Sequence, residues 1–207
     1  MGQSKPRSAD SEPMRYSLFE TPLGWWGIVG FGGLLFRSYC GFSEKSKLSE
    51  AVEADAETLC APQLSALKEA DWLPTLRQRL QRFTHGTKDS FSDVKLQLPP
   101  LTAFQKSVLA ATRKIPLGKT LTYGELAAKA GYPRAARAVG SVMASNRFPV
   151  IIPCHRVVAS GGGLGGYTNP VGVPFKVQLL QLEAEMIELR PDRPGGRQMR
   201  PNSVEST

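Results

Sequence analysis

The segment 151–158, which reads Ile-Ile-Pro-Cys-His-Arg-Val-Val, constrains this chain more than any other part of it. The apolar run before Pro153 is typical of a buried strand. It must end there, because proline fixes φ and has no amide hydrogen to donate. Cys154 is therefore expected at a constrained corner beside His155. A thiol is a strong nucleophile as the thiolate, and an adjacent imidazole commonly lowers its pKa. The alternative is a small buried cysteine beside a hydrogen-bonded core histidine.

The positive charge is concentrated in the second half of the chain. The net charge is +8 over 207 residues. Residues 15–98 contain equal numbers of basic and acidic side chains, whereas residues 99–190 contain eleven Lys and Arg against four acidic residues. A basic half that also contains the candidate nucleophile suggests a polyanionic partner, most often nucleic acid. The alternative is that the charge only aids solubility.

Composition disfavours several other classes of protein. No apolar run approaches the ~18 residues that span a membrane, and residues 1–13 lack the apolar core of a secretory signal. We therefore expect a cytoplasmic protein, or a nuclear one in a eukaryote, with no membrane partner. Cys40, Cys60 and Cys154 have no disulfide-framework spacing, which favours free thiols. A zinc site including His85 is disfavoured because no pair has ligand spacing. We expect no metal.

Composition also divides the chain into two domains. Residues 1–14 and 191–207 are polar and rich in Pro, Ser, Gly, Arg and Asn, so we expect disordered tails. Pro99-Pro100 forms a stiff linker between a first domain, 15–98, and a second, 99–190. The first is predicted to contain strands at 15–20, 27–31, 34–42 and 93–98, and helices at 46–60 and 73–83.

The second domain is predicted to be mostly helical, with helices at 103–114, 123–130, 133–145 and 175–189. Thr102 and Thr122 are suitable N-caps. The two helices on either side of Gly131 have the layout of a helix-turn-helix. Small residues and Arg137 in the second of them would let it approach nucleic acid closely; the alternative is a packed helix with a solvated basic face. The glycine-rich segment 159–167 matches no phosphate-binding pattern and is predicted to be a mobile loop that lines a pocket.

Seven short motifs occur in order through this second half. They are Phe104-Gln105, Ile115-Pro116-Leu117-Gly118, Thr122-Tyr123, Ala135-Ala136-Arg137-Ala138-Val139-Gly140, Asn146, Ile152-Pro153-Cys154-His155-Arg156-Val157-Val158 and Gly165-Gly166-Tyr167. Together they resemble the O6-alkylguanine-DNA alkyltransferases, also called methylated-DNA–protein-cysteine methyltransferases. The resemblance covers about residues 99–188 closely and the first half only in broad character. It implies an α/β, strand-rich, RNase H-like first domain and a mostly α-helical, DNA-binding second domain with a helix-turn-helix.

The resemblance also implies a single-turnover repair reaction. The cysteine takes the alkyl group from O6 of guanine and keeps it as a thioether, which offers no good leaving group. The damaged nucleotide must first rotate out of the duplex, because a side chain cannot reach the alkyl carbon inside the base stack. The implied partner is double-stranded DNA containing O6-alkylguanine, and no cofactor is needed. We expect a monomer, with cooperative binding to DNA left open.

The resemblance implies five catalytic residues. Cys154 is the nucleophile, His155 draws off its proton through a water molecule, and Glu183 orients the imidazole. Asn146 joins the hydrogen-bond network at the turn. Tyr123 donates its phenolic proton to the departing guanine, because its ordinary pKa of about 10 keeps that proton in place near neutral pH.

Other residues are implied to contact DNA or the flipped base. Arg137 fills the gap left by the extruded base, on a helix that the family places in the minor groove. The remaining DNA or base contacts are Tyr123 again, Ala135, Ala138, the Val157 carbonyl, Gly165, Tyr167 and Thr168. Simpler roles remain open: Tyr123 as a core residue, Glu183 as a surface acid paired with Lys176, and Arg137 in a local ion pair. Arg156 is expected to fix the local backbone.

The chain departs from the family at one point near the pocket. Thr168-Asn169-Pro170 stands where the family usually has Ser-Gly-Gly, and the segment before the last helix is about two residues longer. Pocket shape and the tolerated alkyl group therefore stay open. One rival function is an alkyltransferase-like lesion sensor without turnover, but those relatives carry tryptophan in place of Cys154. Another is a cysteine hydrolase, which would not explain Arg137.

Overall fold

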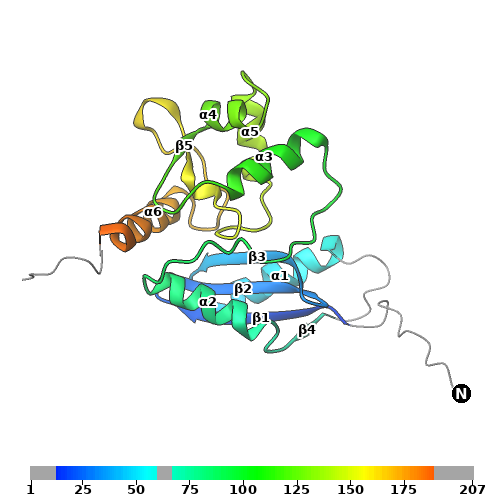
Figure 1. Cartoon of the computed structure of the whole chain (residues 1–207). Coiled ribbons are helices and arrows are strands. Elements are labelled where there is room, and N and C mark those ends of the chain that lie inside the picture. Colours follow the sequence, from blue (N-terminus) through cyan, green and yellow to red (C-terminus); the bar gives the residue numbers. More distant parts are fainter. Residues whose placement is uncertain (1–12, 60–66, 189–207) are drawn as a thin grey trace, which may run out of the picture.

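The computed structural model describes residues 13–59 and 67–188, which form two lobes (Figure 1). The predicted tails therefore lie almost wholly outside the described residues, as does Cys60. The first lobe is a sheet with helices, and the second is mainly helical. Within the described residues, no helix is both long and apolar enough to cross a membrane.

The first lobe contains one four-stranded sheet in the order β3-β2-β1-β4. The strands β1 (Arg15–Thr21), β2 (Gly24–Phe31) and β3 (Leu34–Phe42) are antiparallel neighbours. The two-residue β4 (Lys68–Glu69), which the sequence did not predict, pairs with β1 in parallel. The two predicted helices are present as α1 (Lys45–Leu59) and α2 (Pro74–Thr84), and they flank the sheet. β3 lies at one edge of the sheet.

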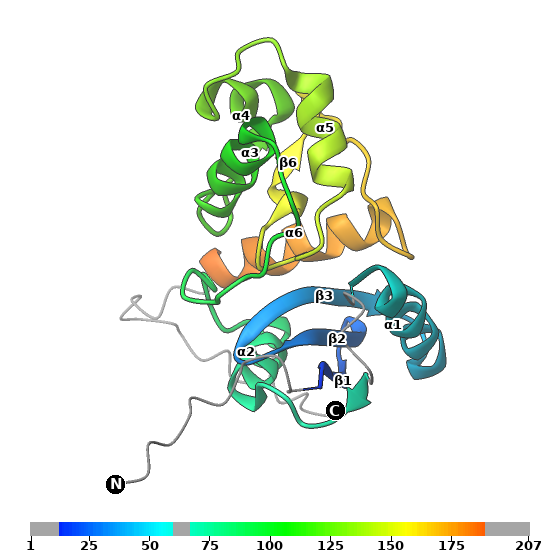
Figure 2. The same ribbon diagram turned by 90° about the vertical axis from the view of Figure 1, so that its right-hand side faces the viewer.

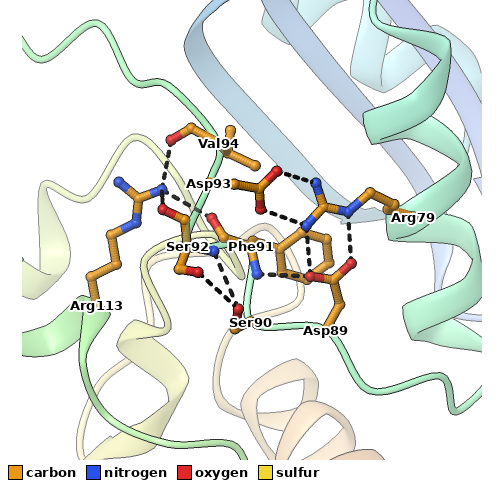
Figure 3. A network of polar contacts seen from close by, with 8 residues as sticks. All are labelled: Arg79, Asp89, Ser90, Phe91, Ser92, Asp93, Val94 and Arg113. Atoms are coloured by element: carbon orange, nitrogen blue, oxygen red, sulfur yellow. Dashed lines mark hydrogen bonds and ion pairs between the residues drawn. The ribbon is translucent and has the colours of Figure 1, made fainter.

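The predicted strand at 93–98 is wrong, because its backbone pairs with β3 only at Leu35, through bonds to Lys95 and Gln97, and side chains hold the rest of the segment. Its one bridge joins Leu96 to Leu35. Figure 3 shows Arg79 of α2 bonded to the carboxylates of Asp89 and Asp93 at 2.7–2.8 Å. Arg113, from the second lobe, donates to the carbonyls of Phe91 at 2.9 Å, Ser92 at 3.4 Å and Val94 at 2.6 Å. Two arginines, one from each lobe, thus clamp the connection between the lobes.

The apolar core continues from one lobe into the other. One face of the sheet packs against α1 through residues such as Val29, Leu48 and Val52. The opposite face contributes Trp26 to a larger cluster that includes Phe175 of α6 (Val173–Glu188). In Figure 2, α6 crosses between β3 and the other helices of the second lobe. The second lobe is therefore packed directly onto the sheet.

The α-helices described in the second lobe are α3 (Ala103–Arg113), α4 (Tyr123–Lys129), α5 (Ala136–Ala144) and α6. The first two begin at the capping residues that the sequence indicates. Thr102 and Thr122 each form a capping box with the glutamine or glutamate three residues later. The expected helix start at residue 133 is wrong: α5 begins at Ala136 because Arg134 has a φ of 78°, which is incompatible with a right-handed helix.

Candidate active site

The segment before Cys154 is a series of turns, so the predicted buried strand is wrong. Val150 has a φ of 72°, and the amide of Ile152 donates to the carbonyl of Phe148 at 2.8 Å. Cys154–Arg156 then forms a single 3-10 turn that starts at Pro153. The apolar residues are buried because they pack in the core and not because they pair in a sheet. The constrained corner that proline implies is present.

A two-stranded parallel pair brings the cysteine next to the helix-turn-helix. β6 (Val157–Val158) follows the turn and pairs with β5 (Leu121–Thr122), directly before Tyr123 at the start of α4. Cys154 is 7% exposed and opens onto a cavity of about 580 Å³. The cavity wall includes Tyr123, Arg137, Gly140, Met143, Tyr167 and Thr168. Cys154 is therefore a buried thiol with access to one cavity, which argues against a purely structural cysteine.

Asn146 holds both the turn and the sulfur. Its Nδ2 donates to the Ile152 carbonyl at 2.9 Å and to the sulfur of Cys154 at 3.2 Å. Its Oδ1 accepts the amide hydrogen of Phe148 at 3.0 Å. All the polar atoms of this side chain are thus engaged, and one N–H points at the reactive atom.

The thiol itself differs from the expectation. Burial raises the pKa of Cys154 above its usual value, and the hydrogen bond from Asn146 and the charge of Lys176 offset this only in part. His155 is not among the groups that lower the pKa of the thiol. The Tyr167 hydroxyl also lowers the thiol pKa, although its geometry falls short of a hydrogen bond. The resting protein therefore holds a protonated thiol at neutral pH.

His155, Arg156 and Glu183 form one buried polar cluster. The Nε2 of His155 lies 2.8 Å from Oε1 of Glu183, and neither side chain is exposed. Arg156 contacts both carboxylate oxygens at 2.7–3.0 Å and donates to the Ile115 carbonyl at 2.6 Å. Burial alone would raise the pKa of Glu183, but the hydrogen bonds and charges of His155 and Arg156 outweigh it and hold that pKa below its usual range. Glu183 is thus ionised, and its pairing with Lys176 at the surface is excluded.

The cluster leaves one ring nitrogen of His155 free. Burial lowers the pKa of His155, so the ring is neutral at pH 7. Because Nε2 faces an ionised carboxylate, the proton belongs on Nε2. Nδ1 is then an acceptor, and it is buried without a hydrogen-bond partner among the described residues. An unpaired buried acceptor is costly unless it has a function or a water partner.

Lys176 is a site residue that the sequence reasoning missed. Its side chain is fully buried, and its Nζ donates to the carbonyls of Val157 and Leu164, each at 2.6 Å. It also lies 3.5 Å from the Gly166 carbonyl and 6.0 Å from the centroid of the Tyr123 ring. The lysine fixes the glycine-rich segment to β6 and places a positive charge near the thiol. The face of α6 that it shares with Phe175, Leu179, Glu183 and Met186 is mainly apolar, and this was the available signal.

Tyr123 lies against the glycine-rich segment. A Cβ on Gly165, which has a φ of 70°, would lie 2.7 Å from the Tyr123 hydroxyl, so a larger residue would displace the ring. Burial raises the pKa of Tyr123, with a further increase from Cys154. The phenol is half-buried and faces the cavity, so it differs from an ordinary core tyrosine.

Arg137 is exposed in the first turn of α5 and lines the same cavity. It makes no ion pair with any residue in the described part of the chain, so the alternative of a local ion pair is not supported there. Of the other predicted contacts, Tyr167 and Thr168 line the cavity. The structure places Ala135, Ala138, Val157 and Gly165 outside its immediate lining. The Val157 carbonyl is occupied by Lys176.

Comparison with known proteins gives consistent matches. A family model described as "6-O-methylguanine DNA methyltransferase, DNA binding domain" matches residues 103–185. A protein from Methanosarcina acetivorans named methylated-DNA–protein-cysteine methyltransferase is 38% identical over 172 residues, 82% of this chain and 98% of the relative. One of the same name from Haemophilus influenzae is 41% identical over 108 residues, 52% of this chain and 59% of the relative.

Solved structures agree over both lobes. Mycobacterium tuberculosis OGT in complex with DNA has a TM-score of 0.63 and 31% identity, and the match covers 83% of this chain and 94% of that one. The O6-methylguanine methyltransferase of the same organism has a TM-score of 0.68 and 29% identity, over 87% and 96% of the two chains.

Proposed function

This chain belongs to the O6-methylguanine-DNA methyltransferase family, and we propose that it repairs duplex DNA by moving the alkyl group of O6-alkylguanine onto Cys154. It is thus a methylated-DNA–[protein]-cysteine S-methyltransferase that acts once. The observation that carries the proposal is the position of Cys154. Its sulfur opens onto a cavity that Tyr123 and Arg137 also line, and the following residue, His155, is buried with one ring nitrogen that has no hydrogen-bond partner in the described chain.

The transfer balances without any co-reactant. The thiol proton passes to His155 through a water molecule, and the sulfur attacks the alkyl carbon. The bond from that carbon to O6 breaks, and its electron pair leaves with the guanine. Tyr123 gives the guanine a proton, and the proton held by His155 finally restores the phenol through solvent. The net change is one thioether and one unmodified guanine.

The buried cluster supports the role of His155 as the base. A histidine with Nε2–H directed at an ionised carboxylate is stabilised when Nδ1 takes up a proton, because the carboxylate offsets the new charge. Glu183 would supply that charge while Arg156 keeps it ionised. A resting thiol with a raised pKa requires such a base, since few thiolates exist at neutral pH.

The second lobe is proposed to bind DNA through the α4–α5 helix-turn-helix. Arg137 is an exposed cation without an ion-pair partner in the described chain, at the mouth of the cavity, as a residue that replaces a flipped nucleotide requires. Binding in the minor groove suits a protein that searches for lesions with little sequence preference. The further proposed contacts to DNA or the base are Tyr123, Ala135, Ala138, Val157, Gly165, Tyr167 and Thr168. We propose that the protein is a monomer and that its partner is double-stranded DNA containing O6-alkylguanine.

We also propose that the first lobe is an RNase H-like domain extending over residues 15–98. The support is its strand order, with three antiparallel strands and a short parallel strand beside β1. The second domain would then extend over residues 99–190. The segment that the two arginines of Figure 3 hold, residues 89–94, lies just before the proposed boundary at Pro99.

The test is the intact mass of the protein after incubation with duplex oligonucleotide containing O6-methylguanine. Repair predicts a gain of one methylene, about 14 Da, on Cys154, and no gain in Cys154→Ala, which should still bind the duplex. Binding of the lesion without any mass gain would instead identify a lesion sensor. Repeated release of product would identify a hydrolase.

A further inference from the structure

The outer edge of β3 contacts two segments of the second lobe, one that precedes Cys154 and one that follows the glycine-rich stretch. β3 is the edge strand of the sheet and, in Figure 2, the strand nearest the second lobe. Ser38 and Cys40 are two residues apart, so their backbone polar groups point to the same side of the strand. Both residues use that side to bind the second lobe.

The first contact holds the segment that precedes the cysteine. The amide of Ser38 donates to the Arg147 carbonyl at 3.0 Å, and the hydroxyl of Ser38 donates to the Pro149 carbonyl, also at 3.0 Å. This segment begins at Asn146, which donates to the sulfur of Cys154. The first lobe therefore anchors the turn that orients the thiol.

The second contact holds the segment that follows the glycine-rich stretch. Nδ2 of Asn169 donates to the Cys40 carbonyl at 2.7 Å, across 129 residues of sequence. Oδ1 of the same side chain accepts the Val171 amide hydrogen at 3.0 Å, which sets the turn. Asn169 comes directly after Tyr167 and Thr168, two residues of the cavity wall.

Apolar packing also connects β3 to the cavity wall formed by Tyr167 and Thr168. Gly41 has a φ of 76°, and a Cβ there would lie 2.7 Å from the ring of Phe175, so the β3 backbone touches that ring. Phe175 in turn stacks on Tyr167, with ring centroids 6.4 Å apart and an interplanar angle of 26°. Two contacts with β3 thus hold Tyr167 in place. One is the hydrogen bond from Asn169, two residues further along the chain, to the Cys40 carbonyl. The other is the packing of Tyr167 on Phe175, which in turn lies against Gly41.

We propose that Asn169 is a positioning residue through which the first lobe sets the width of the alkyl pocket. The inference rests on the proposed function and deepens it. With its tie to Cys40 in place, the Tyr167–Thr168 wall stays close to the sulfur, which favours small O6-alkyl groups. Without the tie, the wall moves outward: methyl transfer slows because the base is held less closely, and a bulky group gains room.

The experiment compares Asn169→Asp with Val171→Ala. Aspartate keeps the oxygen that accepts the Val171 amide but replaces the donor to Cys40 with a second acceptor. Val171→Ala alters an exposed side chain of the same turn and keeps every backbone bond. Rate constants are measured on one duplex sequence carrying O6-methylguanine or O6-benzylguanine. Asn169→Asp is expected to slow methyl transfer about tenfold, the scale of one lost hydrogen bond, and to raise the benzyl-to-methyl ratio at least fivefold. Val171→Ala should change neither.

A second measurement needs no DNA, so its result does not depend on whether the protein repairs alkylated DNA. Amide hydrogen exchange in peptides covering residues 164–172 should be at least tenfold faster in Asn169→Asp than in the wild-type protein. Ser38→Ala, which removes the bond to Pro149, should leave these peptides unchanged. Unchanged exchange in Asn169→Asp overturns the tie, whether or not the wild-type protein transfers an alkyl group. Equal loss of methyl and benzyl transfer, with an unchanged ratio, overturns the control of pocket width.

Discussion

The imidazole of His155 and the carboxylate of Glu183 meet at 2.8 Å in a region from which solvent is excluded. Arg156 binds the same carboxylate from another side. A base, its orienting acid and a fixed cation thus form one cluster, and two of the three residues belong to the reactive turn itself. The carboxylate binds both of these side chains and also accepts the Gly118 amide hydrogen at 2.9 Å, and these contacts determine how the cluster responds to mutation and to pH.

Removing the charge of Glu183 should destabilise the fold strongly. In Glu183→Gln, Arg156 becomes a buried cation without its counter-charge, which costs about 3–5 kcal/mol. Urea unfolding monitored by tryptophan fluorescence measures the loss. Glu185→Gln, on the exposed face of the same helix, should change the free energy of unfolding by less than about 0.5 kcal/mol. Equal stability of the two variants would contradict the cluster.

Stability should fall on acidification, beginning with His155. The folded-state pKa of His155 lies below 6.5 and that of Glu183 below 4.5, so the unfolded chain binds more protons as pH falls. The stability present at about pH 7.5 is therefore lost first below pH 6.5 and further below pH 4.5. Urea unfolding at about pH 7.5 and about pH 5 tests the first step. His155→Gln should show a smaller difference between these two pH values; a wild-type protein equally stable at both would contradict the assignment.

The Cys154 thiol should titrate above the usual range for a cysteine. Because burial raises its pKa, labelling of Cys154 by iodoacetamide should continue to increase beyond pH 9 in the absence of DNA. Asn146→Ala removes a hydrogen bond that lowers the pKa, so its labelling curve should move to still higher pH. Site-specific labelling is read by peptide mass spectrometry. A midpoint below that of free cysteine would mean that the resting thiol is already ionised.

Arg137→Ala should separate repair of DNA from reaction with a free base. Without the side chain that occupies the vacated stack, transfer from a duplex should slow about tenfold or more, the scale of a few lost contacts. Reaction with free O6-benzylguanine should change less than about twofold. Lys106→Ala removes the same charge from an exposed position outside the cavity lining and serves as the control. Equal losses on both substrates would argue against the proposed role.

Replacing Lys176 by methionine should loosen the glycine-rich segment. The substitution keeps the apolar stem but leaves buried carbonyls without a donor, at a cost of about 2–4 kcal/mol in unfolding free energy. It also removes a charge that lowers the thiol pKa, so labelling of Cys154 should need higher pH. Lys119→Met, at an exposed position, is the matched control. Unchanged stability would show that water replaces the lysine.

The sequence by itself determined the local features of this protein. The caps at Thr102 and Thr122, the corner at Pro153 and the adjacency of Cys154 and His155 follow from neighbouring residues. Such interactions involve residues only a few positions apart, so they depend little on the rest of the fold. The family motifs added the named roles. The errors at 93–98 and in the apolar run before Pro153 came from apolar patterns, which predict burial but do not distinguish a buried strand from a buried turn.

Only the tertiary structure decided which distant groups meet. Lys176 bonds to the Val157 carbonyl, Arg156 binds Glu183, and Asn169 reaches Cys40. These partners are separated by 19, 27 and 129 residues, and their contacts depend on how α6 packs across the edge of β3. The thiol pKa was decided in the same way, because it depends on how completely the surrounding chain excludes water.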